Sequence, residues 1–398
     1  MQGKQLFRYY LIISCLYAGG LGIWSGTIYL YMKHIGYTYG QINLFLVVFW
    51  IISFFTEIPM GMLADKYGQL RIGMLSCVVR ALGLIGIVMA NLGICYLMIG
   101  ACLTAIGQSL YSGSLDSWIV NKSKEISIDL DSIFAKKSTI VTITTTLLGY
   151  IGSQYLGNAG LQYPLIGGAI LLVLPIPFFI YLDYKLKDSY DNKLKQEKIL
   201  MSLRNIKFNN KIIVYFVMLL SVLFITTNPY NQWQLFFQRN GCHIQTGYIL
   251  AAINLVSILG AYLMNFIKFK NKLFLFGVQI LVMMIFLVLA VLCKTRQELT
   301  SIIFFLIHTL VTSSNEVTQC SLLQEKITSN EVRTTITSAY NCIESLISIL
   351  AIAIDGVISS KLGIGIGWMI LGIFGIVLFV LFSYWNHRIE VTKNNKWR

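Results

Sequence analysis

The sequence predicts an all-α integral membrane protein with twelve transmembrane helices in two six-helix bundles. Of its 398 residues, 56% are apolar and only 12% are charged, which is too apolar for a soluble globular domain. A helix needs roughly 20 apolar residues to cross about 30 Å of hydrocarbon. Runs of that length recur from one end of the chain to the other, and basic residues divide unevenly between the segments that join them.

Six apolar runs make up the first half of the chain. The first is longer than a signal-peptide core and lacks an Ala-x-Ala-like cleavage site, so we interpret it as a retained helix. The predicted spans are 9–32, 41–63, 72–90, 94–120, 138–156 and 160–182.

Six further runs follow a polar stretch at 183–210. These spans are 211–237, 246–267, 273–293, 299–323, 334–360 and 362–385. The chain is thus expected to hold a bundle at 1–184, a cytoplasmic linker at 185–210, and a bundle at 211–398 with a short cytoplasmic tail. Charged and aliphatic residues alternate between 185 and 207, which leaves open an amphipathic helix on the inner leaflet or a flexible tether.

Basic residues indicate which side of the membrane each connecting segment faces. With the N-terminus inside, five of them fall outside, Arg80 lies within a span, and the other 25 of 31 face the cytoplasm. This bias predicts that both termini are cytoplasmic, and it explains the net charge of +14 without a nucleic-acid partner. The five outside are Lys33, Arg239, Lys294, Arg296 and Lys361.

The sequence lacks the motifs of a pump, an enzyme or a metal protein. Its 8 cysteines are scattered, with no Cys-x-x-Cys and no histidine at ligand spacing, so neither disulfides nor a metal is expected. No Walker loop and no nucleophile–base constellation is present, and no cofactor is expected. The expected partners are a small-molecule substrate, protons and the lipid bilayer, and the chain is expected to be a monomer.

A weak internal repeat relates the two halves. An offset of 200 residues sets Asp116 over Glu316 and Asp65 over Asn265. Together with the six-plus-six count, this favours duplicated halves with pseudo-two-fold symmetry, an arrangement that lets two bundles rock around a central site. The alternative is that the matches arise by chance, because the chain is built largely from a few apolar residue types.

The segment between the second and third spans carries the most informative motif. Residues 57–71 read EIPMGMLADKYGQLR. This resembles the Gly-x-Leu-Ala-Asp-Arg-x-Gly-Arg-Arg signature of the major facilitator superfamily, and the resemblance implies that fold and a latch between the bundles. Glycines would let the backbone turn tightly, and Asp65 would bind the N-terminus of a neighbouring helix. The latch candidates are Gly61, Asp65, Lys66, Gly68, Gln69, Arg71, Asn121 and Arg333.

A narrower resemblance is to bacterial members of that family, many assigned as exporters of drugs or small molecules. The similar pieces are Glu-Ile-Pro-Met-Gly at 57–61, Ser-Gly-Ser-Leu-Asp at 112–116, Tyr-Asn-Gln-Trp-Gln at 230–234 and Arg-Thr-Thr-Ile-Thr-Ser at 333–338. The resemblance implies a bacterial cell membrane. Gln69 and Asn121 stand where relatives carry a basic residue and its acidic partner, so a weakened latch is expected. Gly149 and Gly152 only hint at the antiporter signature, which has a proline, so direction stays open.

Three ionisable residues of the first half lie at similar depth within their spans. Glu57, Arg80 and Asp116 lie roughly 8–13 Å from the cytoplasmic ends, at a rise of about 1.5 Å per residue. They could meet, and an ion pair of Arg80 with one carboxylate would be a structural explanation that leaves the second acid over.

Three acids of the second half have no basic residue within a span to neutralise them. Desolvation disfavours the charged form of Glu316, Glu344 or Asp355, so such an acid would hold a proton and release it when water or a cation arrives. Glu344 lies near mid-bilayer and is our first choice for proton coupling, whereas Asp355 is expected near the outer surface. His308 is a packing residue or a relay. The coupling candidates are Glu344, Glu316, Asp116, Glu57, Arg80 and His308.

A polar and aromatic run at 228–234 suits a water-filled cavity better than lipid. Together with two aromatic residues of the first span it supplies the substrate candidates, although an interfacial aromatic belt is the alternative for part of this set. The candidates are Trp24, Tyr29, Tyr230, Asn231, Trp233 and Gln234.

The favoured function is proton-coupled efflux of a small amphipathic or cationic compound, such as a drug, an antibiotic or a peptide-like metabolite, by alternating access. Acids outnumber bases within the spans, and the narrower resemblance is to exporters. Proton-coupled uptake is the first alternative. A non-transporting sensor or accessory protein on the same fold is the second.

Overall fold

The structure is a computed structural model that describes residues 3–112, 114–126, 130–186, 210–238, 246–264, 266–267, 271–294, 297–326 and 330–395. All regular secondary structure in these ranges is helical, which confirms the predicted fold class. The chain divides into two compact units. Unit 1 comprises Met1–Glu197 with Ile244–Ala251, and unit 2 comprises Lys198–His243 with Ala252–Arg398. Most of the predicted linker, including both interpretations of it, lies outside the described residues.

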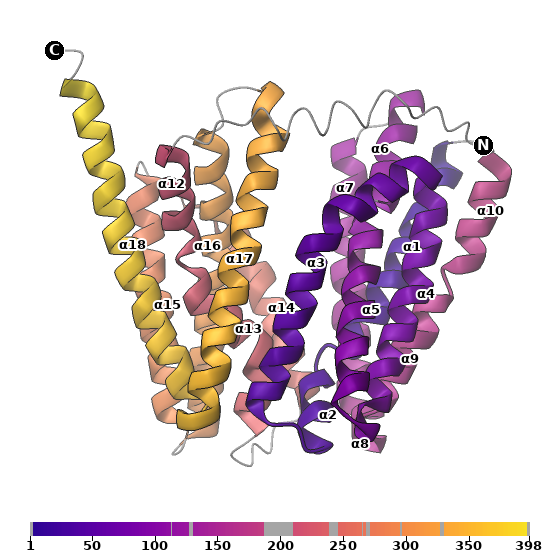
Figure 1. Ribbon diagram of the computed structural model, residues 1–398, viewed down its shortest axis with the longest axis horizontal. Helices are drawn as coiled ribbons and strands as arrows, with labels where there is room; N and C mark the ends of the chain where they lie inside the picture. Colours follow the sequence, from indigo (N-terminus) through magenta and orange to yellow (C-terminus); the bar gives the residue numbers. More distant parts are fainter. Residues whose placement is uncertain are drawn as a thin grey trace. The chain divides into compact units, whose positions relative to one another are not determined.

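Unit 1 is built on contacts that α4 and α1 make with later helices. α4 packs against α5 and α9, and α1 packs against α7 and α9 (Figure 1). The helices are α1 (Gly3–Gly22), α2 (Ile28–His34), α3 (Tyr39–Tyr67), α4 (Gln69–Val88), η1 (Met89–Leu92), α5 (Ile94–Ser112), α6 (Leu115–Ile126), α7 (Leu130–Ile151), η2 (Gly152–Leu156), α8 (Gly157–Ala159), α9 (Tyr163–Val173) and α10 (Ile176–Leu186).

Unit 2 repeats this pairing scheme. α15 packs against α16 and α18, and α13 packs against α17 and α18, as duplicated halves predict. The first residues of α14, up to Ala251, belong to unit 1. The helices are α12 (Asn210–Leu220), α13 (Leu223–Gln238), α14 (Thr246–Leu263), α15 (Lys272–Cys293), α16 (Glu298–Lys326), α17 (Asn330–Leu362) and α18 (Ile364–Asn395).

Every predicted span overlaps one or more of these helices. Within the described ranges, nine helical stretches are long and apolar enough to cross a membrane. The segments predicted at 9–32, 138–156 and 299–323 are not among the nine, because α1 ends at Gly22, α7 carries lysines and a run of threonines, and α16 carries Thr-Ser-Ser-Asn-Glu. The count of twelve therefore stays a prediction.

Several predicted spans are broken where hydropathy alone shows no break. The chain turns at 23–27 between α1 and α2, and α12 and α13 are separated by Ser221 and Val222. α9 ends before Pro175, which has no N–H and disfavours helix in the residue before it. At such breaks, backbone N–H and C=O groups lose their partners within the helix, and side chains can form hydrogen bonds with them.

The turn at 23–27 packs against a deformed part of α7. Residues of η2 form one turn of π-helix directly after α7. Gly152 lies so close to the carbonyl of Ile23 that a methyl group at this position would overlap it. Two turns before Gly152, the backbone of Thr145 lies against Gly22, where an added methyl would come within 2.8 Å of the Thr145 Cα. The turn at 23–27 and η2 can therefore approach this closely because Gly152 has no side chain.

Candidate functional site

Unit 2 contains a cavity that two of the predicted acids line. Its volume is about 340 Å³, and Glu316 of α16 and Glu344 of α17 both face it. The residues of α16 in the lining recur every three or four positions, which is one face of a helix. No Lys or Arg is among the lining residues, which are Val222, Leu223, Thr226, Thr312, Asn315, Glu316, Gln319, Cys320, Leu323, Tyr340, Asn341 and Glu344.

The break between α12 and α13 lies in the wall of this cavity. Gln319 donates a hydrogen bond from Nε2 to the carbonyl of Leu219, at 3.0 Å, and so binds a backbone group near that break. Asn315 donates to Oε1 of Gln279 at 3.3 Å. The Tyr340 ring is 6% exposed and its hydroxyl has no acceptor in hydrogen-bond geometry. The cavity therefore has an acidic, polar side, on which hydrogen bonds hold the amide side chains of Asn315 and Gln319 in place.

The predicted substrate run on α13 does not line this cavity. Trp233 and Gln234 are 5% and 2% exposed, whereas Tyr230 is 76% exposed. Asn231 donates to the carbonyl of Thr227 within its own helix, at 2.8 Å. Consecutive residues point in directions about 100° apart around a helix, so a continuous run cannot face one cavity. A role in binding for these four residues stays a prediction.

Asp355 is fully buried, so the interpretation that it is a solvated acid was wrong, whereas its place near the outer surface stays a prediction. Its exposed fraction is 0%. Gln232 donates to Oδ2 at 2.7 Å, and Ser359 donates to Oδ1 at 2.9 Å. The indole N–H of Trp368 donates to Oε1 of Gln232 at 3.3 Å. This Asp355 cluster joins α13, α17 and α18. We missed Gln232 in the sequence because it lies inside the run that we assigned to a cavity.

His308 follows the packing interpretation that the sequence left open. Its side chain is 3% exposed, and Nδ1 lies 3.0 Å from the carbonyl of Met283 on α15. A carbonyl can only accept, so Nδ1 carries the hydrogen. The ring also packs against Phe305. His308 does not line the acidic cavity, and these contacts join α16 to α15.

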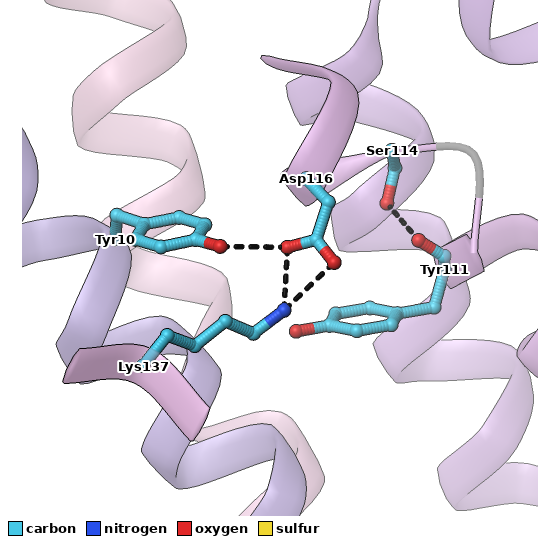
Figure 2. A network of polar contacts seen from close by, with 5 residues as sticks. All are labelled: Tyr10, Tyr111, Ser114, Asp116 and Lys137. Carbon is cyan, nitrogen blue, oxygen red and sulfur yellow. Dashed lines mark hydrogen bonds and ion pairs between the residues drawn. The ribbon is translucent and has the colours of Figure 1, made fainter. Parts of the chain in front are cut away.

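In unit 1 the acid of α6 has a partner that we did not predict. Figure 2 shows the Asp116 carboxylate between the hydroxyl of Tyr10 and the ammonium group of Lys137. Tyr10 donates at 2.8 Å, and Lys137 contacts the two carboxylate oxygens at 2.5 and 2.7 Å. The chain turns at Ser114, whose hydroxyl donates to the Tyr111 carbonyl, so Asp116 lies in the first turn of α6, where a negative charge is favoured.

The structure does not form the ion pair of Arg80 with Asp116 or Glu57 that the sequence offered as one explanation. Arg80 donates from Nη1 to the Tyr17 hydroxyl at 3.0 Å and from Nη2 to Oε1 of Gln108 at 3.1 Å. Glu57 is exposed on α3. Glu57, Arg80 and Asp116 were predicted to lie at similar depth in the membrane, but similar depth does not bring side chains together when they leave their helices in different directions.

Trp24 lies in the turn that breaks the first predicted span. Its indole packs against Gly168 of α9, where a methyl group would come within 3.1 Å of Nε1, and this N–H has no acceptor. Tyr29 is half-buried on α2. Tyr31 donates to the Val88 carbonyl at 2.5 Å. These contacts are internal to unit 1, and a role in binding for Trp24 and Tyr29 stays a prediction.

The latch motif is mostly helix rather than loop. α3 continues to Tyr67, Gly68 alone separates it from α4, and its φ of 102° requires the left-handed freedom of glycine. Gly61 is inside α3 with no atom within 4 Å of an added methyl, so the expectation that it allows a tight turn was wrong.

The polar latch residues contact neighbours within unit 1 where they are described. Lys66 lies over the ring of Tyr67, and Gln69 begins α4. Arg71 pairs with Asp183 of α10 at 2.9 Å. The side chains of Asp65, Asn121 and Arg333 lie outside the described part of the chain. Their pairing therefore stays a prediction.

Comparisons with known proteins agree with this architecture. The NupG nucleoside transporter structure has a TM-score of 0.72 at 16% identity and covers 95% of this chain and 98% of that chain. The xylose transporter XylE from E. coli has a TM-score of 0.66 at 13% identity, with 95% of each chain covered. At these identities the likeness concerns the fold alone.

Sequence comparison identifies the family. The MFS-type transporter YxaM of Bacillus subtilis (strain 168) is 26% identical over 253 residues. The match spans 60% of this chain and 60% of that protein, so less than two thirds of the relative's length is covered. A family model described as Major Facilitator Superfamily matches residues 10–352. The chain therefore belongs to the Major Facilitator Superfamily and is a multi-pass membrane protein.

Proposed function

We propose that this transporter exports a small amphipathic or cationic compound in exchange for protons, with Glu316 and Glu344 as the coupling pair. One observation carries the proposal. Two carboxylates from different helices line one cavity of about 340 Å³, and none of its described lining residues is Lys or Arg.

The chemistry of this pair suits exchange of a proton for a cation. Glu316 and Glu344 line the same cavity, and a negative charge on one carboxylate opposes ionisation of the other. Two carboxylates that share a site cannot both ionise cheaply, and desolvation adds to the cost. The pair is therefore neutralised by a proton or by a cation, and each excludes the other. Alternation between the two is antiport.

The rest of the lining supports an amphipathic cargo. Val222, Leu223 and Leu323 supply apolar surface, and the ring of Tyr340 offers an aromatic face. Amides of Asn315 and Gln319 are already engaged with neighbours, which orders the polar side. Pockets of this kind bind an apolar body and orient it through a few polar groups.

The orientation of the chain is part of the proposal. The positive-inside bias supports an orientation with both termini in the cytoplasm, and the resemblance to bacterial exporters supports a bacterial cytoplasmic membrane. Reporter fusions at the two termini and within the stretch at 183–210 should all report the cytoplasm. A fusion that reports the outside at any of these points would overturn this orientation.

The coupling test uses proteoliposomes that carry a pH-sensitive dye and a panel of lipophilic cations and amines. Glu344→Gln and Glu316→Gln mimic the protonated form, so each should abolish cation movement driven by a proton gradient while cargo exchange at equal pH continues. Glu298→Gln, in the first turn of the same α16 but outside the cavity, is the matched control and should transport normally.

The outcomes separate the alternatives. Cation efflux together with proton entry supports export, whereas movement of both in the same direction would indicate uptake by symport. If both glutamine variants keep normal proton-driven transport, the coupling carboxylates lie elsewhere and the proposal fails.

A further inference from the structure

Arg80 of α4 is a buried cation whose described partners are all neutral. Its side chain is 6% exposed. The two hydrogen-bond acceptors that it reaches are the hydroxyl of Tyr17 and the amide of Gln108, at 3.0 and 3.1 Å, and its Nε has none. The acids that the sequence offered as partners do not contact it, since Asp116 binds Lys137.

The surrounding helices hold the guanidinium in a defined place. Gly107 of α5 lies against the stem of Arg80, where a methyl group would come within 2.7 Å of Cβ and 3.0 Å of the backbone N. The guanidinium carbon lies 5.7 Å from the centroid of the Tyr17 ring. Tyr17 is stacked on Tyr111 with centroids 3.5 Å apart and planes 3° apart. The charge is therefore confined between α1 and α5.

Donors outnumber acceptors around this group. A guanidinium carries five N–H donors and no acceptor, and only two of the five are used here. Ser14 lies one turn before Tyr17 on α1 and beside Tyr111. Its side chain is 2% exposed, and its hydroxyl faces Tyr111 without an acceptor in good hydrogen-bond geometry. Among the described residues, three N–H donors of Arg80 and the hydroxyl of Ser14 thus lack an acceptor.

This imbalance has a direct electrostatic consequence. Arginine cannot lose its proton in a protein, so burial cannot neutralise it as it can a carboxylic acid. An ionised side chain within a membrane span costs a few kcal/mol on insertion scales and is normally paired. A small anion would supply the missing charge and accept the spare hydrogen bonds at once.

We propose that Arg80, Ser14 and Tyr17 form a binding site in unit 1 for one small monoanion, either a carboxylate group or a chloride ion. The planar fork of arginine suits a carboxylate. The site uses no residue of the acidic cavity in unit 2, so it does not rest on the proposed antiport.

The test measures thermal unfolding of the purified full chain in detergent. Ionic strength is kept constant while a bulky sulfonate buffer anion is replaced by chloride or by acetate. Specific binding should raise the unfolding midpoint by about 5 °C near saturation, and the rise should follow anion concentration. Arg80→Met should lose this rise, and Ser14→Ala should need roughly tenfold more anion because one hydrogen bond is lost.

Two further variants make the result specific. Arg8→Met removes an exposed arginine of α1 and should keep the full response to anions. Arg80→Lys keeps the positive charge but lacks the planar guanidinium, so anions should raise its unfolding midpoint only weakly. This variant keeps the test valid if Arg80→Met does not fold. A response to chloride alone assigns an ion site, and a response to acetate that chloride reduces by competition assigns a carboxylate site. Equal responses in wild type, Ser14→Ala and both Arg80 variants would overturn the proposal.

Discussion

Replacement of Asp355 by alanine should be among the most destabilising single changes in unit 2. Asp355 is 0% exposed and accepts hydrogen bonds from Gln232 at 2.7 Å and Ser359 at 2.9 Å. Its removal takes the acceptor from two buried donors at about 1–3 kcal/mol each, so the loss is about 2–6 kcal/mol. At about 2–4 °C per kcal/mol for a domain of this size, the unfolding midpoint should fall by roughly 10 °C.

Intrinsic fluorescence of the detergent-purified protein during heating would measure this change. Asp355→Asn keeps one acceptor and should lose about half as much. Asp183→Ala is the matched control, because its pair with Arg71 is more exposed and such pairs contribute about 0–1 kcal/mol. If Asp355→Ala melts within about 2 °C of Asp183→Ala, the Asp355 cluster does not stabilise unit 2 and the calculation is wrong.

Three further changes test other contacts. Lys137→Met and Asp116→Asn should couple by about 0.5–1 kcal/mol in a double-mutant cycle of thermal unfolding, because the pair is partly exposed, and strict additivity would contradict this pairing. Gly107→Val should lower the yield of monodisperse protein in fluorescence-detected gel filtration, because the valine side chain would meet the α4 backbone. In Gly61→Ala the added methyl meets no atom within 4 Å, so the yield should not change. Equal yields of the two variants would refute the packing argument. Asp65→Ala should insert normally but change transport in vesicles if it binds a helix end in one state, and unchanged transport would count against the latch.

Hydropathy was sufficient to predict where helices lie but not where they break. Each predicted span falls on helix because length and apolarity are local properties of the chain. The turn at 23–27 and the break at Ser221 lie within continuous apolar runs, and they depend on what the neighbouring helices bring to the backbone. Only Pro175 marked a break that the sequence itself could have shown.

The acidic cavity was partly predictable, and the first-half ion pair was not. Counting residues along a span gives depth, and the sequence singled out Glu316 and Glu344 as acids with no base within a span. It did not predict that the two line one cavity. Depth does not say in which direction a side chain leaves its helix. Arg80 and Asp116 therefore have separate partners, and Lys137 was placed outside a span although α7 begins seven residues before it.

The contact between the turn at 23–27 and η2 affects how sequence variation in this transporter should be interpreted. Gly152 has no room for any side chain against the Ile23 carbonyl. A mutational scan should find this position as intolerant as a binding residue, although its role is to let two irregular backbones approach. Strong selection at Gly152 would then report a steric requirement of unit 1, and a search for cargo contacts guided by invariance alone would be drawn to the wrong residue.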